Sequence, residues 1–341
     1  MTPHAIKKAA AASEPLRSVS VIAAGSYVPE KVLTNAELAQ MVDTSDEWIT
    51  TRTGISERRI AASNEVTSDL AQKAAQRAMQ KAGVTADEID LIIVASITPD
   101  MPFPSTACFV QEKLKAFRAV CFDIQAACSG FIYGLEIARQ FLANGTAGTA
   151  LVIGSEKLSC ITDWQDRATC VLFGDGAGAA VLRHRPGTRG ILATSIASDG
   201  RLTGLLNLPG GGSLHPASQQ TVNDRLHYLK MAGREVFKHA VNSMVDAANQ
   251  ALKKAAVKID QVNLIIPHQA NMRIIKAIGE RLGAPAEKYF VNLNRYGNMS
   301  AASIPVALDE AEQQGRIKSG DIILLVAFGG GFTWGATLLE W

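Results

Sequence analysis

A cysteine between a predicted strand and a predicted helix is the first residue in this sequence that could act as a nucleophile. Residues 119–124 form a β-rich run, and apolar residues recur at helical spacing from Phe131 to Leu142. Cys128 lies in the turn between them, near a helix N-terminus whose positive dipole end favours thiolate over thiol. A thiolate attacks acyl carbons, whereas a small buried apolar cysteine is the more common alternative.

A histidine and an asparagine stand at further element junctions. His268 follows the predicted strand 264–267, at the strand end where open α/β sheets build their sites. A lone histidine is more often structural, but the junction resembles that of Cys128. Asn298 precedes a predicted helix that runs to about Gln314. Asparagine is a favoured cap and turn residue, although its side-chain N–H could also be aimed at a substrate carbonyl.

A run of three glycines, 329–331, follows the predicted strand 324–328. Glycine permits close approach of the backbone and unusual dihedral angles. The run lacks the Lys-Ser/Thr pair of a phosphate loop and the GxGxxG spacing of a dinucleotide site. Backbone amides that stabilise an oxyanion are the better functional interpretation, and a plain tight turn is the alternative.

The elements that must position these residues form an internal repeat. A predicted helix over 67–81, closed by Gly83, precedes a predicted strand over 89–95. Residues 78–93 align without gaps to 251–266, and about half of the aligned positions are identical. A second similarity pairs 173–182 with 328–339. The pattern predicts an α/β protein of two similar halves, 17–190 and 191–341, after a mobile N-terminal tail over 1–16.

Composition narrows the class of protein. The chain has 341 residues, 47% hydrophobic and 19% charged, with a net charge of +2, which argues against a nucleic-acid binder. The sequence has no apolar run long enough to span a bilayer and no apolar N-terminal stretch of secretory type. Five cysteines without a CxxC pair argue against a disulfide scaffold or a zinc ribbon. We expect a cytoplasmic protein in which Cys108, Cys121, Cys160 and Cys170 are small buried residues.

Taken together, these motifs resemble one enzyme family. The sequence resembles β-ketoacyl-acyl-carrier-protein synthase III, the initiating condensing enzyme of type II fatty-acid synthesis, in the thiolase superfamily. The resemblance runs from about residue 18 to the C-terminus in the family's order and spacing. The matching segments are GSYVP at 25–29, TSDEWI at 44–49, TRTGI at 51–55, AACSG at 126–130, FGDGAGA at 173–179, PHQAN at 267–271, GN at 297–298 and FGGGFTW at 328–334.

The resemblance implies a layered αβαβα body and a role for each matching residue. Cys128 would be the acylated nucleophile, His268 and Asn298 would assist decarboxylation, and the N–H groups of Cys128 and Gly330 would form the oxyanion hole. The Cys-His-Asn set distinguishes the initiating type from relatives with Cys-His-His or Cys-His-Cys. No metal or cofactor is implied, because coenzyme A thioester is a substrate.

The resemblance also implies binding residues around this centre. The residues expected to hold coenzyme A are Trp48, Arg52, Arg167 and Asn271. The residues expected to receive acyl carrier protein are Arg273, Lys238 and Arg281, although Glu280 interrupts that basic patch. Phe103 would limit the acyl pocket from across a homodimer interface, or would be an interface aromatic without a gating role.

The implied reaction joins a short acyl group, expected from acetyl-CoA, to malonyl-acyl carrier protein through acyl-Cys128. The products would be 3-oxoacyl-acyl carrier protein, coenzyme A and CO₂. A ketosynthase of specialised metabolism with another acyl donor or acceptor is one alternative. A cysteine hydrolase that uses Cys128 and His268 is another, and in that case hydrolysis would survive Asn298→Ala. A non-catalytic scaffold is disfavoured because every expected catalytic position is filled.

Overall fold

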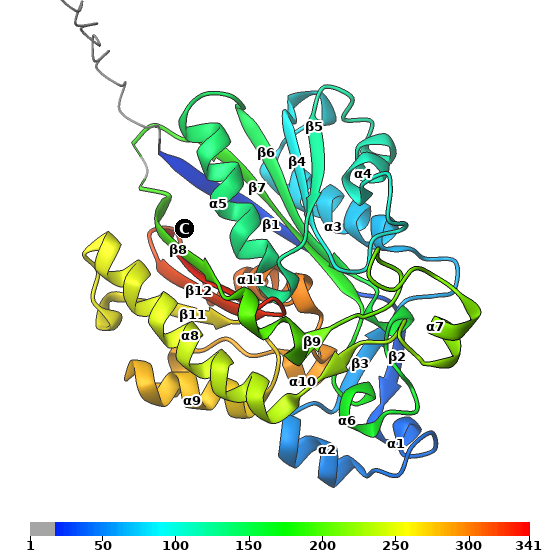
Figure 1. The fold of residues 1–341 in the computed structure, drawn as a ribbon. Helices are drawn as coiled ribbons and strands as arrows, with labels where there is room; N and C mark the ends of the chain where they lie inside the picture. Colours follow the sequence, from blue (N-terminus) through cyan, green and yellow to red (C-terminus); the bar gives the residue numbers. More distant parts are fainter. Residues whose placement is uncertain (1–17, 188) are drawn as a thin grey trace, which may run out of the picture.

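The computed structural model describes residues 18–187 and 189–341, so the expected tail over 1–16 lies outside the described residues. Two main sheets and the helices between and around them make up the body (Figure 1). The strands are β1 Val19–Tyr27, β2 Lys31–Thr34, β3 Glu57–Ile60, β4 Leu91–Ala95, β5 Val120–Ile124, β6 Thr149–Glu156, β7 Gly176–His184, β8 Ile191–Ser198, β9 Leu206–Asn207, β10 Lys230–Met231, β11 Leu264–Pro267, β12 Ile322–Gly329 and β13 Thr333–Glu340.

The helices alternate with these strands as the sequence predicts. They are α1 Asn35–Leu38, α2 Asp46–Thr53, α3 Thr67–Ala82, α4 Thr106–Leu114, α5 Gly130–Ala143, α6 Arg167–Cys170, α7 Gln219–Asn223, α8 Gly233–Ala255, α9 Met272–Leu282, α10 Leu293–Tyr296 and α11 Ser303–Gln313. The predicted end of the first long helix is confirmed, because Gly83 caps α3 in the left-handed conformation with φ 63°.

The two main sheets repeat one topology. The first has the order β1-β7-β6-β4-β5, and the second has the order β8-β13-β12-β11. In each sheet the first three of these strands are antiparallel neighbours and the next pairing is parallel. The place of β5 is taken in the second sheet by an isolated parallel bridge between Ile265 and Tyr289. This correspondence confirms the two similar halves predicted from the sequence.

Helices divide the body into five layers, α-β-α-β-α. Helices α3 and α4 cover the outer face of the first sheet, whereas α8 contacts the outer face of the second sheet and packs against α9. Helices α5 and α11 contact strands of both sheets and lie between them (Figure 1). Their apolar residues share one core with both sheets, in which Phe131 and Leu135 of α5 join Ile304 and Leu308 of α11.

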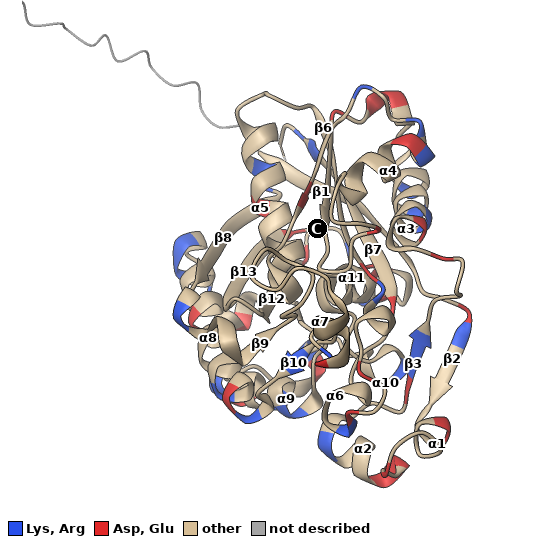
Figure 2. Cartoon of the chain, turned by 45° about the vertical axis from the view of Figure 1, so that its right-hand side comes forward, with Lys and Arg blue, Asp and Glu red and all other residues tan. Residues whose placement is uncertain are grey.

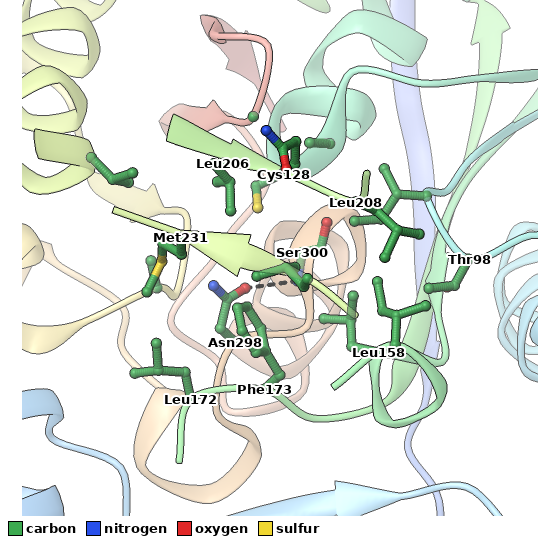
Figure 3. Close-up of a pocket in the computed structure, with 18 of the residues that line it drawn as sticks. Thr98, Cys128, Leu158, Leu172, Phe173, Leu206, Leu208, Met231, Asn298 and Ser300 are labelled. Atoms are coloured by element: carbon green, nitrogen blue, oxygen red, sulfur yellow. Dashed lines mark hydrogen bonds between the residues drawn. The ribbon is translucent and has the colours of Figure 1, made fainter. Parts of the chain in front are cut away.

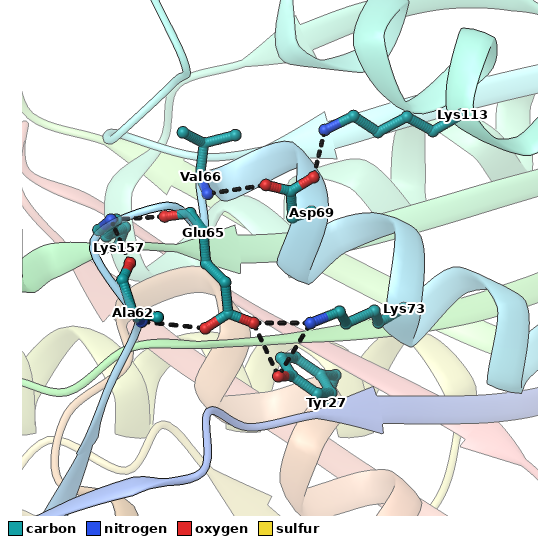
Figure 4. A network of polar contacts seen from close by, with 8 residues as sticks. All are labelled: Tyr27, Ala62, Glu65, Val66, Asp69, Lys73, Lys113 and Lys157. Carbon is teal, nitrogen blue, oxygen red and sulfur yellow. Dashed lines mark hydrogen bonds and ion pairs between the residues drawn. The ribbon is translucent and has the colours of Figure 1, made fainter.

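A polar network fixes the segment that leads into α3. The Glu65 carboxylate accepts hydrogen bonds from Tyr27 Oη at 2.8 Å and Lys73 Nζ at 2.6 Å (Figure 4). Lys157, directly after β6, donates to the backbone carbonyls of Ala62 and Glu65. These contacts tie the segment before α3 to the end of β6, which is the strand end nearest the cavity described below.

Candidate active site

Side chains from both halves line one large cavity of about 990 Å³ (Figure 3). The cavity brings together all the residues proposed for chemistry: Cys128, His268, Asn298 and Gly330. Its wall is largely apolar near the sulfur of Cys128, with contributions from Leu206, Leu208, Leu158 and Met231. An enclosed, mostly apolar cavity with a few convergent polar groups is the usual form of a small-molecule site.

Cys128 lies in a one-turn 3-10 helix, Ala127–Ser129, between β5 and α5. The preceding Ala127 has φ 46°, in the left-handed region that residues other than glycine rarely adopt. Burial raises the pKa of the Cys128 thiol to about 12. Burial therefore favours the thiol as the resting form, whereas the position near a helix N-terminus led us to expect a thiolate.

The turn between β12 and β13 packs directly against the Cys128 turn. A Cβ added to Gly329 would lie 2.5 Å from the backbone nitrogen of Cys128, so only glycine fits there. Thr333 Oγ1 donates to the Ala126 carbonyl at 2.7 Å and accepts from Ser129 Oγ at 2.6 Å. These contacts hold Gly330 beside Cys128, the arrangement that two oxyanion-binding amides require.

His268 follows β11 and is 3% exposed. Its backbone N–H donates to the Val326 carbonyl at 2.8 Å, which extends the β11–β12 pairing by one residue. Its Nδ1 atom is buried and has no hydrogen-bond partner among the described residues. Burial lowers the pKa of His268 to about 3, so the ring is neutral near neutral pH and one of its nitrogens carries a proton.

Asn298 is fixed by both its backbone and its side chain. Its backbone N–H donates to Leu172 O at 2.8 Å, and its carbonyl accepts from the Gly174 N–H at 3.0 Å. The side-chain Oδ1 accepts from the Ser300 N–H at 2.8 Å (Figure 3). Because this partner is a donor, it fixes the amide orientation and leaves the NH₂ group for the cavity. The preceding Gly297 has φ 64°, and a Cβ there would lie 2.7 Å from Leu172 O.

The junctions of Cys128 and His268 are not equivalent, contrary to the sequence-based interpretation. Cys128 follows the edge strand β5, whereas His268 follows β11, whose counterpart in the first sheet is β4. The true counterpart of the Cys128 turn is the 3-10 turn Ser300–Ala302 before α11, since Ser300 also has φ 46°, as Ala127 does. The sequence repeat did not reveal this relation, because it covers a different helix–strand unit.

The residues expected to hold coenzyme A form the cavity mouth. The Arg52 and Arg167 guanidinium groups lie 4.6 and 5.1 Å from the centroid of the Trp48 ring. Trp48, Arg52 and Asn271 line the cavity, whereas Arg167 lies beside it and donates to Asp43 O at 2.9 Å. Asn271 caps α9 and donates to the Arg52 carbonyl at 3.1 Å. An indole with two guanidinium groups close to it suits a planar base that carries phosphates.

The residues expected to receive a carrier protein lie on α8 and α9, where Lys and Arg gather in Figure 2. Arg273 lines the cavity, and its guanidinium lies 5.6 Å from the Phe237 ring. Lys238 is exposed on α8, and Arg281 on α9 donates to Asn242 Oδ1. The structure therefore places one of the three at the cavity and two on the adjoining surface.

Phe103 does not line the cavity in this chain. It lies between β4 and α4 and is 86% exposed.

The cysteines other than Cys128 differ from the expectation that all are small and buried. Cys170 is buried, Cys108 and Cys121 are partly buried, and Cys160 is exposed and lines the cavity. The expectation is wrong for Cys160 because it follows β6 in a turn at the cavity wall.

Sequence reasoning missed three polar residues behind the nucleophile: Thr98, Glu156 and Ser300. Glu156 ends β6 and is fully buried, and Thr98 and Ser300 line the cavity. One signal was available, since Glu156 ends an eight-residue run that is otherwise apolar or small, at the strand end where α/β sites are built.

The described part of the chain holds neither a cluster of metal-binding residues nor a membrane-spanning helix. No group of three or more His, Cys, Asp and Glu residues that could hold a metal ion occurs within residues 18–187 and 189–341. Over the same described ranges, no helix is long and apolar enough to cross a membrane.

The layered fold and the Cys-His-Asn cavity define a thiolase-type condensing enzyme. The sequence matches the family models described as 3-oxoacyl-[acyl-carrier-protein] synthase III over residues 122–200 and as its C-terminal part over 252–341. The chain belongs to the β-ketoacyl-[acyl-carrier-protein] synthase III family, which are acyltransferases that catalyse the initiating condensation of fatty-acid biosynthesis.

Individual relatives cover almost the whole chain. A β-ketoacyl-[acyl-carrier-protein] synthase III of Desulfitobacterium hafniense is 56% identical over 324 residues, which are 95% of this chain and 98% of the relative. The crystal structure of the Aquifex aeolicus 3-oxoacyl-[acyl-carrier-protein] synthase III is 52% identical, with a TM-score of 0.88 over 95% of this chain and 100% of that one. A priming β-ketosynthase of the R1128 polyketide pathway is 35% identical, with a TM-score of 0.89 over 96% and 97%.

Proposed function

We propose that this chain condenses a short acyl group from acyl-CoA, acetyl-CoA first among them, with malonyl-acyl carrier protein. The observation that carries the proposal is the meeting of Cys128, His268, Asn298 and Gly330 in one cavity. The reaction requires a nucleophile for the acyl group, donors for two successive oxyanions, and space for a pantetheine arm. The products are 3-oxoacyl-acyl carrier protein, coenzyme A and CO₂.

In the first half-reaction, Cys128 attacks the thioester carbonyl of acyl-CoA. The N–H groups of Cys128 and Gly330 stabilise the tetrahedral oxyanion, and coenzyme A leaves. One such donor contributes about 10²–10³-fold in rate. The contacts of Gly329 and Thr333 with the Cys128 turn support this assignment, because they fix the two amides relative to each other.

In the second half-reaction, malonyl-acyl carrier protein loses CO₂ and its enolate attacks acyl-Cys128. The enolate oxygen needs donors, and a neutral His268 and the NH₂ group of Asn298 can supply them. The Ser300 N–H supports this role, since it occupies the only acceptor atom of the Asn298 amide and turns its donors to the cavity. Burial of His268 supports it as well, because a neutral imidazole keeps the site from holding the malonyl carboxylate as an ion pair.

Substrates enter at the mouth formed by Trp48 and its two arginines. We assign the adenine and phosphates of coenzyme A to Trp48, Arg52 and Arg167, and the pantetheine arm to the tunnel beside Asn271. The acidic acyl carrier protein docks on Arg273, Lys238 and Arg281.

The reaction uses no further cofactor. The five cysteines of the chain are free thiols, which suit a reducing compartment, so the cytoplasm is the proposed location.

The proposed functional unit is a homodimer. Strand β5 is one of the two edge strands of the first sheet, and its first residue Val120 is 61% exposed. Phe117 and Phe103, on segments that adjoin β5 and α4, are 66% and 86% exposed. An apolar face along a free sheet edge is typical of a protein interface. Pairing there would bring Phe103 of one copy to the acyl pocket of the other.

The test is a two-step assay. The protein is incubated with radiolabelled acetyl-CoA and the labelled peptide is identified by mass spectrometry, after which malonyl-acyl carrier protein is added. We expect label on Cys128 and then labelled 3-oxoacyl-acyl carrier protein with release of CO₂. Label on Cys128 without carrier-dependent CO₂ release would contradict the proposed initiating reaction.

A second candidate is a priming ketosynthase of specialised metabolism, which the 35% identical R1128 relative favours. Acetyl-, isobutyryl-, isovaleryl- and longer acyl-CoA donors compared under one assay separate the two functions. A preference for a long donor, or for an acceptor other than the carrier protein of fatty-acid synthesis, would support the second candidate.

A further inference from the structure

A buried carboxyl group lies behind the nucleophile. Glu156, the last residue of β6, is 0% exposed. Its Oε2 atom accepts from Thr98 Oγ1 at 2.6 Å, from the Ile97 N–H at 3.1 Å and from Ser96 Oγ at 3.2 Å. Three donors converge on one carboxyl oxygen in a place where a hydrophobic side chain would cost less to bury.

No cation compensates this carboxyl group among the described ion pairs. Lys157 is adjacent in the chain, but its ammonium donates to the Ala62 and Glu65 carbonyls (Figure 4). Burial therefore raises the pKa of Glu156 to about 7, despite its hydrogen bonds. The group can exist as acid or as carboxylate near neutral pH, which a purely structural side chain does not require.

The turn Ser300–Ala302 packs both against β6, which ends at Glu156, and against the Cys128 turn. Ser300 is 2% exposed, lines the cavity, and its hydroxyl makes no hydrogen bond to another described residue. Burial raises the pKa of both the Cys128 thiol and the Glu156 carboxyl, and the nearby Ser300 hydroxyl opposes that rise in each case. A buried, unpartnered hydroxyl beside a thiol and a carboxyl can serve both.

Charge conservation shows what the arrangement can do. When Cys128 attacks a thioester, its proton must leave, and a free thiolate would be a second buried anion if Glu156 were ionised. The Glu156 charge already raises the pKa of Cys128. If the thiol proton passes to the Glu156 carboxylate, the negative charge moves from the carboxylate to the reacting sulfur, and no second buried anion forms. His268 is the other candidate acceptor, but burial lowers its pKa to about 3, so its imidazole is a weaker base than the Glu156 carboxylate.

We propose that the Ser300 hydroxyl relays the thiol proton of Cys128 to the Glu156 carboxylate during acyl transfer. This inference rests on the proposed role of Cys128 as the nucleophile. The S–H bond breaks as sulfur bonds to the thioester carbon, Ser300 Oγ takes that proton, and its own proton passes to Glu156. When the tetrahedral intermediate collapses, the bond from carbon to the coenzyme A sulfur breaks and the proton returns through Ser300 to that sulfur. The net change transfers one acyl group and one proton.

The pH dependence follows from the groups that face Glu156. They are Cys128 on the turn before α5 and Cys160 after β6. Desolvation raises the pKa of each thiol, although part of Cys160 is exposed at the cavity wall. Lys157 points away, because its ammonium donates to the carbonyls of Ala62 and Glu65. Acylation in the wild type is therefore expected to accelerate as pH rises through about 7, where Glu156 loses its proton.

The test measures the two half-reactions separately. Single-turnover acylation of Cys128 by acetyl-CoA is followed by mass spectrometry from pH 5.5 to 8.5, and decarboxylation of malonyl-acyl carrier protein is followed by CO₂ release. In Glu156→Gln and Ser300→Ala we expect acylation to fall about 10²–10⁴-fold, the range of general base catalysis. Decarboxylation should fall less than about threefold, because the Ser300 N–H that holds Asn298 remains. Glu156→Asp should recover part of the rate and keep the rise near pH 7.

A matched control is Asp175→Asn. Asp175 is also 0% exposed and accepts hydrogen bonds from Ala61 N and Ser159, but it does not line the cavity. This variant should lower the melting temperature without removing the pH-dependent rise in acylation. Unchanged acylation with an unchanged pH profile in Glu156→Gln would overturn the relay, as would equal loss of both half-reactions in Ser300→Ala. Failure of the wild type to acylate Cys128 would instead overturn the proposed function itself.

Discussion

The side-chain carbonyl oxygen of Asn298 accepts a 2.8 Å hydrogen bond from the backbone N–H of Ser300. Ser300 has φ 46°, a conformation that residues other than glycine rarely adopt and that the packing of the turn before α11 maintains. The contact turns the NH₂ group of Asn298 towards the cavity. The same turn therefore sets the direction of the Asn298 side chain through its N–H and carries a buried hydroxyl that lines the same cavity as Cys128.

Asn298→Asp should impair decarboxylation and spare acylation, which is the reverse of the effect expected for Glu156→Gln. Aspartate can still accept from the Ser300 N–H, but as a carboxylate it has no proton to donate to an enolate. We expect decarboxylation to fall about 10²–10³-fold while acylation of Cys128 continues. The control is Asn144→Asp in an exposed turn, where Oδ1 only accepts from Thr146. Decarboxylation at the wild-type rate in Asn298→Asp would contradict the donor role.

Gly329→Ala should disrupt the proposed oxyanion hole of Cys128 and Gly330. The added Cβ would lie 2.5 Å from the Cys128 nitrogen, so the two turns must separate. We expect a loss of about 1–3 kcal/mol in the free energy of unfolding and at least a tenfold loss in acylation rate. Gly200→Ala is the matched control, because no atom lies within 4 Å of its Cβ position. Thermal melting and single-turnover acylation measure both effects, and similar behaviour of the two variants would refute this packing argument.

Trp48→Ala should weaken the binding of acyl-CoA specifically. Stacking of a base on an aromatic ring contributes about 1–3 kcal/mol, which corresponds to roughly a 5- to 150-fold rise in KM for acyl-CoA. The KM for malonyl-acyl carrier protein should stay unchanged, because the carrier presents pantetheine without adenine. Steady-state kinetics with each substrate varied in turn provides this internal control. An equal rise in both KM values would show that Trp48 shapes the shared tunnel rather than an adenine site.

Burial of His268 should make stability depend on pH. The folded pKa of about 3 lies below the ordinary value of 6.5, so the unfolded chain binds the proton more tightly. The contribution of the neutral His268 to the free energy of unfolding is therefore fully present above pH 6.5 and is lost as pH falls towards 3. Glu156 acts in the opposite direction between pH 4.5 and 7, because burial raises its pKa. Thermal melting from pH 7.5 to 4.5 should therefore show a smaller loss of stability on acidification in His268→Asn than in the wild type. Parallel curves would contradict a buried, neutral His268.

Val120→Arg should convert the proposed dimer to a monomer. Val120 begins the free edge strand β5, and a charge there opposes pairing of two edges. Light scattering should give a dimer mass for the wild type and a monomer mass for the variant. Met41→Arg is the control, since Met41 is 50% exposed on a segment between α1 and α2, away from β5. A monomeric wild type would contradict the proposed assembly.

The sequence by itself determined the elements, the repeat and the identity of the chemical groups. Periodicity and caps act over a few residues, so the helix over 67–81 with Gly83 as its cap could be predicted from local pattern. Alignment of 78–93 with 251–266 predicted two halves, which the matching sheet orders confirm. Local patterns singled out Cys128, His268 and Asn298 as candidates, and the resemblance implied the role of each, since the motifs that contain them are short and contiguous.

Only the tertiary structure decided how those groups interact. Glu156 and Ser300 are 144 residues apart in sequence, the difference of their numbers, and no local pattern relates them. The packing of two central helices between two sheets brings their turns together, and it pairs the Cys128 turn with the Ser300 turn rather than with His268. Packing also reversed the expected thiol chemistry. A helix terminus acts locally, whereas the desolvation that raises the pKa of Cys128 depends on every segment that closes the cavity.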